Sequence, residues 1–334
     1  MGSVLTEPIG GPVAWTADDL KRDDSWKLTL SGTALREIDA ALKNVLRRGI
    51  ALRDIRRDDF PLDTLAVDLR TVGNELNTGR GLKLIRGLPV GQYTEDELAL
   101  VYWGIGTHLG DPVSQNSKGD LLGHVRDEGA TLSDLRARGY QTRESQGLHV
   151  DNCDVVGLLC LRTARTGGIS QVVSSMAIYN ELLRRYPWYA GVLYEPFAID
   201  MRGQERAGDS PVWYRPIYSY HDGLLSCGVN FTYMRSAETK TGIPLSAVRL
   251  EALEAMENIA YEQCFEMEFR PGDMQFLNNY VILHDRTPYV DWDEPEKKRH
   301  LLRLWLSVPN ARKLAPNFRS AYADTLRSYE AAPR

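Results

Sequence analysis

The feature that most constrains how this chain folds is a change in hydrophobic pattern near residue 110. Before it, apolar residues recur every three or four positions, and this spacing predicts a helix over 34–48 that ends at Gly49. After it, short segments alternate between apolar and polar side chains, as in 264–270, where Pro271-Gly272-Asp273 then turns the chain back. Helices followed by many antiparallel strands predict a mainly β chain with helical insertions, an α+β sandwich or barrel.

Further elements follow from the same patterns. Helices are predicted over 62–76, from Thr94 toward His108, from 176 to just before Pro187, and from Pro244 to about 263. Strands are predicted over 82–86, 155–161, 192–200, 212–220, 224–233, 274–283 and 300–308. We expect one domain over 1–334, with an N-terminal helical region of about 1–80 packed on the β core, because a large β domain can carry such insertions.

Composition excludes several classes of partner. Lys and Arg total 40 against 45 Asp and Glu, so the net charge of −5 argues against a general nucleic-acid binder or a polybasic membrane binder. No apolar stretch approaches the ~20 residues that cross a bilayer, and no signal-peptide pattern opens the chain. We therefore expect a cytoplasmic protein with a small-molecule substrate and no nucleic-acid or membrane partner. The four cysteines lack CxxC spacing and are predicted to be free thiols.

The first candidate site is the segment Gly147-Leu148-His149-Val150-Asp151. Side chains two positions apart on a strand share one face, so His149 and Asp151 are predicted to point the same way. An imidazole beside a carboxylate offers two ligands to a divalent metal, although a simple His–Asp hydrogen bond at a strand end is the alternative. His284 lies 135 residues later, at the end of a predicted strand, and could complete two histidines and one carboxylate. Such a facial triad leaves open metal positions that suit non-haem Fe(II) oxygen chemistry.

A second candidate site is the strand that begins near residue 299. Arg299, Leu301, Arg303 and Trp305 share one face, and leucines occupy the other. Two arginines on a mostly buried strand need anionic partners, either structural carboxylates or a bound carboxylate that a bidentate guanidinium clamps. Gln115 and Asn116, before Gly119, could line the same active site or form hydrogen bonds within a loop.

The order of these segments is more specific than any one of them. HxD, a Gly167-Gly168 turn followed by Ser170, Asn278-Asn279 before His284, and Arg-His-Leu-x-Arg-x-Trp follow one another along the chain. Over about residues 80–310 this order resembles the Fe(II)/2-oxoglutarate-dependent dioxygenases of the taurine dioxygenase and TfdA-like family. The stretch around His284 is also similar to γ-butyrobetaine hydroxylases.

The resemblance implies a fold, cofactors and residue roles. The fold would be a double-stranded β-helix (jelly-roll) core, and the cofactors would be Fe(II), 2-oxoglutarate as cosubstrate and O2. His149, Asp151 and His284 would be the catalytic metal ligands, Arg299 would hold the distal carboxylate of 2-oxoglutarate, and Ser170 would assist it. Ile169 departs from the family pattern beside Ser170. Arg303 would contact an anionic group of the substrate. Independently of the resemblance, we assign Asn116 to substrate binding from its position before Gly119.

The resulting expectation is an oxygenase that oxidises an unactivated C–H bond of a small anionic or amino-acid-like molecule by hydroxylation, desaturation or cyclisation. 2-Oxoglutarate would be decarboxylated to succinate and CO2. A cupin-like hydrolase or isomerase that uses zinc or manganese without 2-oxoglutarate is the alternative, but it leaves Arg299 and Arg303 without a purpose. A catalytically silent metal-binding module is a third possibility, against which the intact triad argues.

Overall fold

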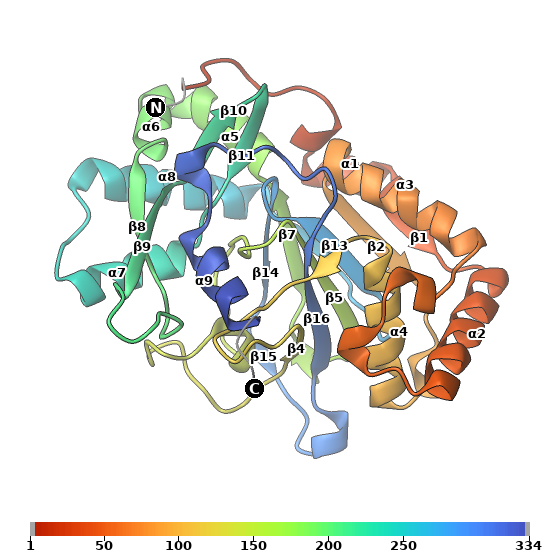
Figure 1. The fold of residues 1–334 in the computed structure, drawn as a ribbon. Helices are drawn as coiled ribbons and strands as arrows, with labels where there is room; N and C mark the ends of the chain where they lie inside the picture. Colours follow the sequence, from red (N-terminus) through yellow and green to blue (C-terminus); the bar gives the residue numbers. More distant parts are fainter. Residues whose placement is uncertain (1–3, 331–334) are drawn as a thin grey trace.

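A seven-stranded sheet runs through the centre of the computed structural model, which describes residues 4–330 (Figure 1). The pairings are antiparallel except that of β1 with β2. Its strands in spatial order are β1 (Lys27–Thr29), β2 (Leu82–Arg86), β13 (Met274–Asn278), β5 (Val155–Arg162), β16 (His300–Ser307) and β3 (Asp111–Pro112), with β4 (Leu122–Val125) also paired to β16.

Smaller sheets complete the β structure. A three-stranded sheet contains β12 (Phe265–Met267), β7 (Ser170–Ser174) and β14 (Ile282–Arg286). Three strand pairs are β8 (Pro196–Asp200) with β9 (Val212–Pro216), β10 (Tyr218–His221) with β11 (Leu224–Cys227), and β15 (Tyr289–Val290) with β6 (Thr166–Gly167).

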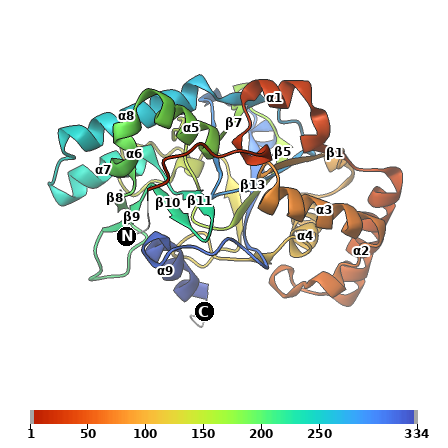
Figure 2. The ribbon, with the colours of Figure 1, turned by 90° about the horizontal axis from the view of Figure 1, so that it is seen from above.

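The helices form two groups with the sheets between them (Figure 2). The first group is α1 (Ala17–Arg22), α2 (Gly32–Arg48), α3 (Thr64–Thr78) and α4 (Glu95–Thr107). The second is α5 (Ser175–Arg185), α6 (Pro187–Leu193), α7 (Phe231–Thr241) and α8 (Ala247–Glu262), and α9 (Ala321–Glu330) lies near the C-terminus. Single 3₁₀ turns occur at 12–14, 24–26, 52–54, 57–59, 90–92, 139–141, 295–297 and 316–318.

Strand β16 shows how the sequence separates core from site. Leu302, Leu304 and Leu306 belong to the apolar cluster that contains the buried faces of α2, α3 and α4. The intervening side chains, Arg303 among them, point to the opposite face of the sheet, because successive residues of a strand alternate sides. A register shift between His300 and Leu301 does not prevent Arg299 from reaching the same side.

The expectation of a mainly β chain was too narrow. Helices hold 39% of the residues and strands 22%, which is a mixed α/β fold. Most of the additional helix lies in elements that the sequence patterns did not predict, namely α1, α6, α7, α9 and the 3₁₀ turns, and two predicted strands are also cut short. The segment 224–233 ends as a strand at Cys227, because the Asn230 side chain accepts a hydrogen bond from the backbone N–H of Tyr233 and caps helix α7. Likewise α6 replaces the start of the strand predicted at 192–200.

Other predictions agree closely with the structure. Strand β2 has the predicted bounds, and α2, α3, α4 and α5 begin within three residues of their predicted starts. All four cysteines are free thiols. Between residues 4 and 330, no helix is both long and apolar enough to cross a membrane.

Candidate active site

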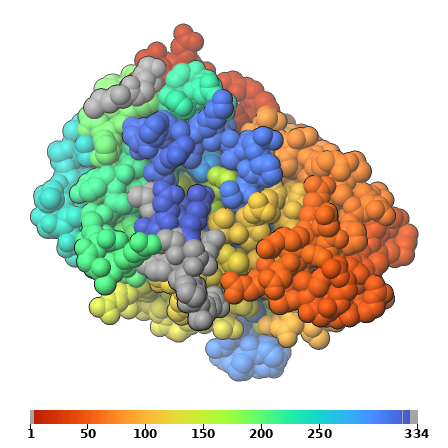
Figure 3. Space-filling model, in the orientation of Figure 1, coloured from red at the N-terminus to blue at the C-terminus, as the bar shows by residue number. Residues whose placement is uncertain are grey.

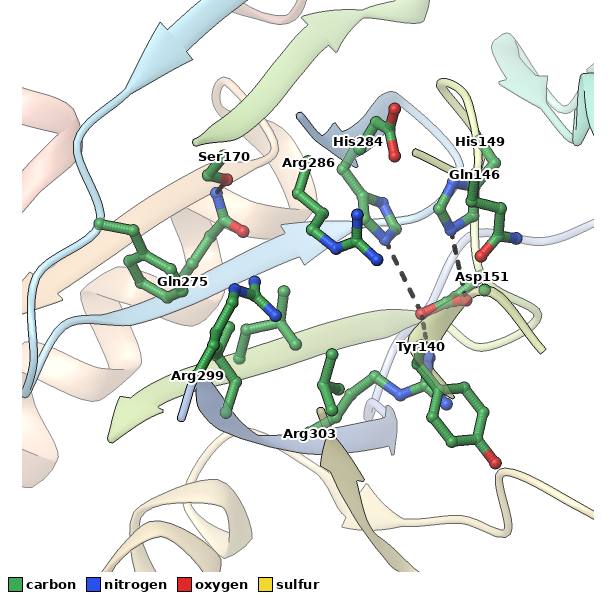
Figure 4. A pocket seen from close by; sticks show the side chains of 16 residues that line it. Tyr140, Gln146, His149, Asp151, Ser170, Gln275, His284, Arg286, Arg299 and Arg303 are labelled. Carbon is green, nitrogen blue, oxygen red and sulfur yellow. Dashed lines mark hydrogen bonds and ion pairs between the residues drawn. The ribbon is translucent and has the colours of Figure 1, made fainter. Parts of the chain in front are cut away.

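Three buried side chains lie close together: those of His149, Asp151 and His284. One ligand atom of each lies within 4.8 Å of the others. The Nε2 atoms of His149 and His284 lie 4.0 and 3.8 Å from the carboxylate oxygens of Asp151 (Figure 4). The spacing of these atoms around a common point fits a two-histidine, one-carboxylate metal site. Among the described residues, this is the single His/Cys/Asp/Glu cluster of that kind.

Backbone pairing brings the two histidines together across 135 positions. His149 and His284 exchange both N–H···O bonds, at 3.0 and 2.8 Å, as an isolated antiparallel bridge. Their rings therefore stand side by side, 4.5 Å apart between centroids. The strand predicted around His149 is reduced to that residue, which forms isolated antiparallel bridges to both His284 and Asn230. The predicted convergence of His149 with Asp151 nevertheless occurs.

Neighbouring groups orient the three side chains. The Nδ1 of His149 donates to the carbonyl of Gly147 at 2.8 Å, which leaves the Nε2 lone pair free to bind a metal. The indole Nε1 of Trp305 donates to Asp151 Oδ2 at 2.8 Å, so that the other oxygen is available. The backbone N–H of Asp151 donates to the side chain of Asn279 at 3.0 Å. This bond gives the second asparagine of the Asn278-Asn279 pair a role in positioning Asp151.

The charges around the triad keep it in the protonation state that a metal requires. Burial alone would raise the pKa of Asp151, but Arg303, the two imidazoles and the Trp305 hydrogen bond together lower it. Burial and the neighbouring His149 lower the pKa of His284 to about 3. Near neutral pH the site therefore holds a carboxylate and an uncharged imidazole, which are metal-binding forms.

A cavity extends from the triad toward Arg299 and the strand that carries Ser170 (Figure 4). The guanidinium of Arg299 is 5% exposed and lies over the ring of Tyr289. Ser170 accepts a hydrogen bond from Gln275 Nε2 at 3.0 Å. Part of the wall is apolar and is formed by Val125, Leu158, Phe269 and Leu301, and the carboxylate-bearing Asp285 also lines the cavity.

The far end of this cavity carries two arginines, Arg286 and Arg299, that form no ion pair with a described carboxylate. Arg299 Nη1 and Gln275 Oε1 have no hydrogen-bond partner within residues 4–330. Arg286 also lines the cavity, donates to the carbonyl of Thr142, and has its pKa lowered to about 10 by burial and by Arg299. Neither arginine forms an ion pair with a described carboxylate, although buried guanidiniums require one. A bound dicarboxylate with an apolar middle fits this end of the cavity.

The Gly167-Gly168 turn gives Arg299 its room. Both glycines have positive φ, 75° and 68°, as the turn between β6 and β7 requires. A Cβ on Gly168 would lie 3.2 Å from Arg299 Nε, closer than side chains normally approach. The turn predicted from the sequence therefore also shapes the arginine pocket.

Arg303 lies between the triad and a second group of polar residues. Its Nη1 is 3.6 Å from Asp151 Oδ2, its Nε donates to Gln115 Oε1 at 2.7 Å, and Tyr140 covers it at 4.7 Å. Asn116 is not brought to the cavity, because its side chain bonds Asp120 and the backbone of Lys118 within its own loop. Its neighbour Gln115 makes the contact with Arg303 instead.

Sequence reasoning did not find Tyr140, Gln146 and Gln275 as parts of the site. Gln275 is a polar side chain inside a fully buried strand, which was a usable signal. Tyr140 and Gln146 lie on an irregular segment, where no periodicity predicts a direction.

Comparisons with known proteins address the family. The chain matches the family described as taurine catabolism dioxygenase TauD, TfdA family over residues 47–305. It is 34% identical to FR-33289 synthase of Streptomyces rubellomurinus over 94% of each chain. It is also 29% identical to the taurine hydroxylase-like protein SAT17 of Stachybotrys chartarum, over 90% of this chain and 80% of the relative.

Solved structures show the same fold at low sequence identity. Asparagine oxygenase, in complex with Fe(II), 3-hydroxyasparagine and succinate, is similar with a TM-score of 0.67 and 17% identity, over 84% of this chain and 93% of that one. The non-haem iron oxygenase OrfP, with Fe, succinate and (3S)-hydroxy-L-Arg, has a TM-score of 0.62 and 15% identity over 84% and 94%. The mixed α/β fold is therefore one that iron oxygenases use.

Proposed function

Because this chain belongs to the taurine catabolism dioxygenase TauD, TfdA family, we propose that His149, Asp151 and His284 hold its Fe(II) and that Arg299, with Ser170, binds 2-oxoglutarate. The chain is an Fe(II)/2-oxoglutarate-dependent dioxygenase, as the resemblance in its motifs indicated. The reaction we propose is oxidation of a C–H bond in a small anionic or amino-acid-like molecule.

One observation carries the residue assignment. A triad with free ligand atoms and a buried guanidinium without a carboxylate partner line the same cavity. A hydrolase or isomerase without a keto acid would leave the charge of Arg299 unbalanced, at a cost in folding free energy. 2-Oxoglutarate supplies a carboxylate at this end and a second carboxylate with a keto group at the metal end.

Each side chain then has a definite task. When bound, iron and 2-oxoglutarate supply with O2 the oxidant for C–H cleavage, and the cosubstrate leaves as succinate and CO2. Arg299 grips the distal carboxylate, with Ser170 donating its hydroxyl, because Ser170 already accepts from Gln275. Trp305 and Asn279 keep Asp151 oriented, and Arg303 balances its charge. Apolar walls exclude water from the cosubstrate.

Relatives support the class of substrate. Solved neighbours contain hydroxylated asparagine and hydroxylated arginine, both amino acids. Two relatives are named for taurine and for uridine 5′-phosphate, molecules that carry a sulfonate and a phosphate. We propose hydroxylation of a molecule with such a polar or anionic group, and we leave Asn116 out of the site.

We also propose that the central and three-stranded sheets together form a double-stranded β-helix, and that 1–334 is one oxygenase domain. The site supports both, because its residues come from both sheets. His284 lies on β14 of the three-stranded sheet and is bridged to His149, and Arg303 lies on β16 of the central sheet.

Anaerobic titration of the Fe(II)-loaded protein with 2-oxoglutarate tests the assignment. We expect a weak visible charge-transfer band, its loss in His284→Ala, and its retention in His221→Ala, whose histidine is exposed in β10. Iron-loaded, folded protein without the band would favour the reaction without 2-oxoglutarate. A normal band in His284→Ala would refute the triad.

A further inference from the structure

A second cavity adjoins the first on the other side of Tyr140. The two share four lining residues, Tyr140, Gln146, Asp151 and Arg303. Because it reaches the metal-binding carboxylate without containing Arg299 or Ser170, it is placed to hold a molecule other than 2-oxoglutarate. The C-terminal segment closes it, since Tyr322 of α9 is buried in its wall, and Figure 3 shows this segment in blue across the face of the molecule.

Arg138 is the first unusual feature of this cavity. It is 6% exposed, and its guanidinium lies between the rings of Tyr140 and Tyr322, 5.5 and 5.7 Å from their centroids. Among the described residues, its guanidinium donates one long hydrogen bond, 3.4 Å to the carbonyl of Gln115, and its Nε has no partner. No described carboxylate forms an ion pair with it.

Arg215 is the second unusual feature of this cavity. It is 4% exposed and packs between the rings of Trp213 and Phe318, and its Nε donates to the carbonyl of Gly228 at 3.2 Å. Burial lowers its pKa to about 10, and no described carboxylate pairs with it. The indole Nε1 of Trp213, in the same wall, is also without a hydrogen-bond partner.

No described acidic residue of the cavity forms an ion pair with Arg138 or Arg215. Asp151 is paired with Arg303. Asp200 Oδ1 lies 2.7 Å from Lys240 Nζ, and Asp200 Oδ2 accepts a hydrogen bond from the Ser236 hydroxyl at 2.7 Å. Burial opposes the charge of Arg215 and lowers its pKa, whereas the burial of Arg138 is outweighed by the surrounding tyrosines and Asp151, which raise its pKa. Two charged guanidiniums therefore line a buried cavity without a described carboxylate in direct contact.

We propose that this cavity binds the phosphonate or phosphate-monoester group of the substrate, held between Arg138 and Arg215 with Trp213 as a further donor. This rests on the proposed function, whose substrate class it narrows. A dianionic PO₃ group neutralises both guanidiniums and accepts several hydrogen bonds, whereas a carboxylate or sulfonate neutralises one. The remainder of the substrate would extend past Arg303 toward the metal, because Arg303 lines both cavities.

Calorimetric titration of the anaerobic protein, loaded with Fe(II) and 2-oxoglutarate, tests this. The bound cosubstrate keeps small anions out of the Arg299 pocket, and its charge-transfer band reports separately on the proposed function. The probes are methylphosphonate, methyl phosphate, methanesulfonate and acetate. We expect the two phosphorus probes to bind at least about tenfold more tightly than the others, and the better of the two identifies the source of the PO₃ group.

Arg138→Gln and Arg215→Gln should each weaken methylphosphonate binding by about 30-fold or more, the effect of losing one partner of a buried charge pair. Arg136→Gln is the matched control, an exposed arginine two residues from Arg138. The ligand-free melting temperature of the two variants should not fall, as it would if these arginines only supported the fold. Equal binding of acetate and methylphosphonate, or unchanged binding in both variants while the charge-transfer band persists, would overturn the inference and leave the proposed function intact.

Discussion

Replacing Arg299 with alanine removes a buried guanidinium at the far end of the cosubstrate cavity. The side chain is 5% exposed, its Nη1 has no partner among residues 4–330, and it forms no ion pair with a described carboxylate. In Arg299→Ala the distal carboxylate of 2-oxoglutarate would be buried without its bidentate partner. The loss for such pairs is about 2–5 kcal/mol.

We expect a loss in the lower part of that range, because Arg286 lines the same cavity and still offers a positive charge. At about 1.4 kcal/mol per decade, this is roughly a 30- to 300-fold weaker affinity for 2-oxoglutarate. Arg299→Lys should recover only part of it, since an ammonium lacks the planar fork. The ligand-free protein should lose little stability, because burial already disfavours the charge and lowers the pKa of Arg299.

The assay is anaerobic titration of each Fe(II)-loaded variant with 2-oxoglutarate, followed by the charge-transfer band. Arg136→Ala, which removes an exposed arginine, controls for a general loss of positive charge. Near-normal affinity in Arg299→Ala together with severe loss in Arg303→Ala would mean that the two arginines have the opposite roles.

Three other perturbations address the metal end of the cavity. Arg303→Ala should reduce substrate-triggered succinate formation more than it reduces the affinity for 2-oxoglutarate. It should also raise the pKa of Asp151, because Arg303 lies 3.6 Å from that carboxylate. Equal losses of succinate formation and of 2-oxoglutarate affinity would contradict this. Asn279→Ala removes the acceptor of the Asp151 N–H and should weaken Fe(II) binding by about 1–3 kcal/mol, measured by competition with a chelator, while unchanged iron affinity would argue against positioning. The metal-free protein should lose stability as pH falls from about 6.5 toward 3, because the unfolded state binds a proton that buried His284, with its pKa near 3, does not. The free energy of unfolding, measured with denaturant at several pH values in this range, should depend less steeply on pH in His284→Gln than in the wild type. An identical pH dependence would refute the lowered pKa of His284.

Local patterns in the sequence were sufficient for many elements and for the metal-binding residues. The helical spacing around Leu42 and the buried strand Leu82–Arg86 depend on neighbours in the chain, and both appear in the structure at nearly the predicted bounds. His149 and Asp151 are two positions apart, so their shared direction is also local. The order of motifs identified the family, which the comparisons confirm.

Long-range pairing decided the rest. His284 meets His149 only because two backbone hydrogen bonds join segments 135 residues apart. Asn116 bonds Asp120 within its own loop, whereas Gln115 accepts a hydrogen bond from Arg303, 188 positions away, and this long-range contact is not visible in the sequence.

Arg138 and Arg215 are the strongest example of this limit. In the sequence they are ordinary arginines 77 positions apart, with no periodicity to mark them. Only the packed structure shows that both are buried in one cavity, that the nearby Asp200 is already paired, and that neither arginine forms an ion pair with a described carboxylate. Charge balance is a property of three-dimensional neighbours, so a sequence can supply the charges but cannot show which ones are left without partners.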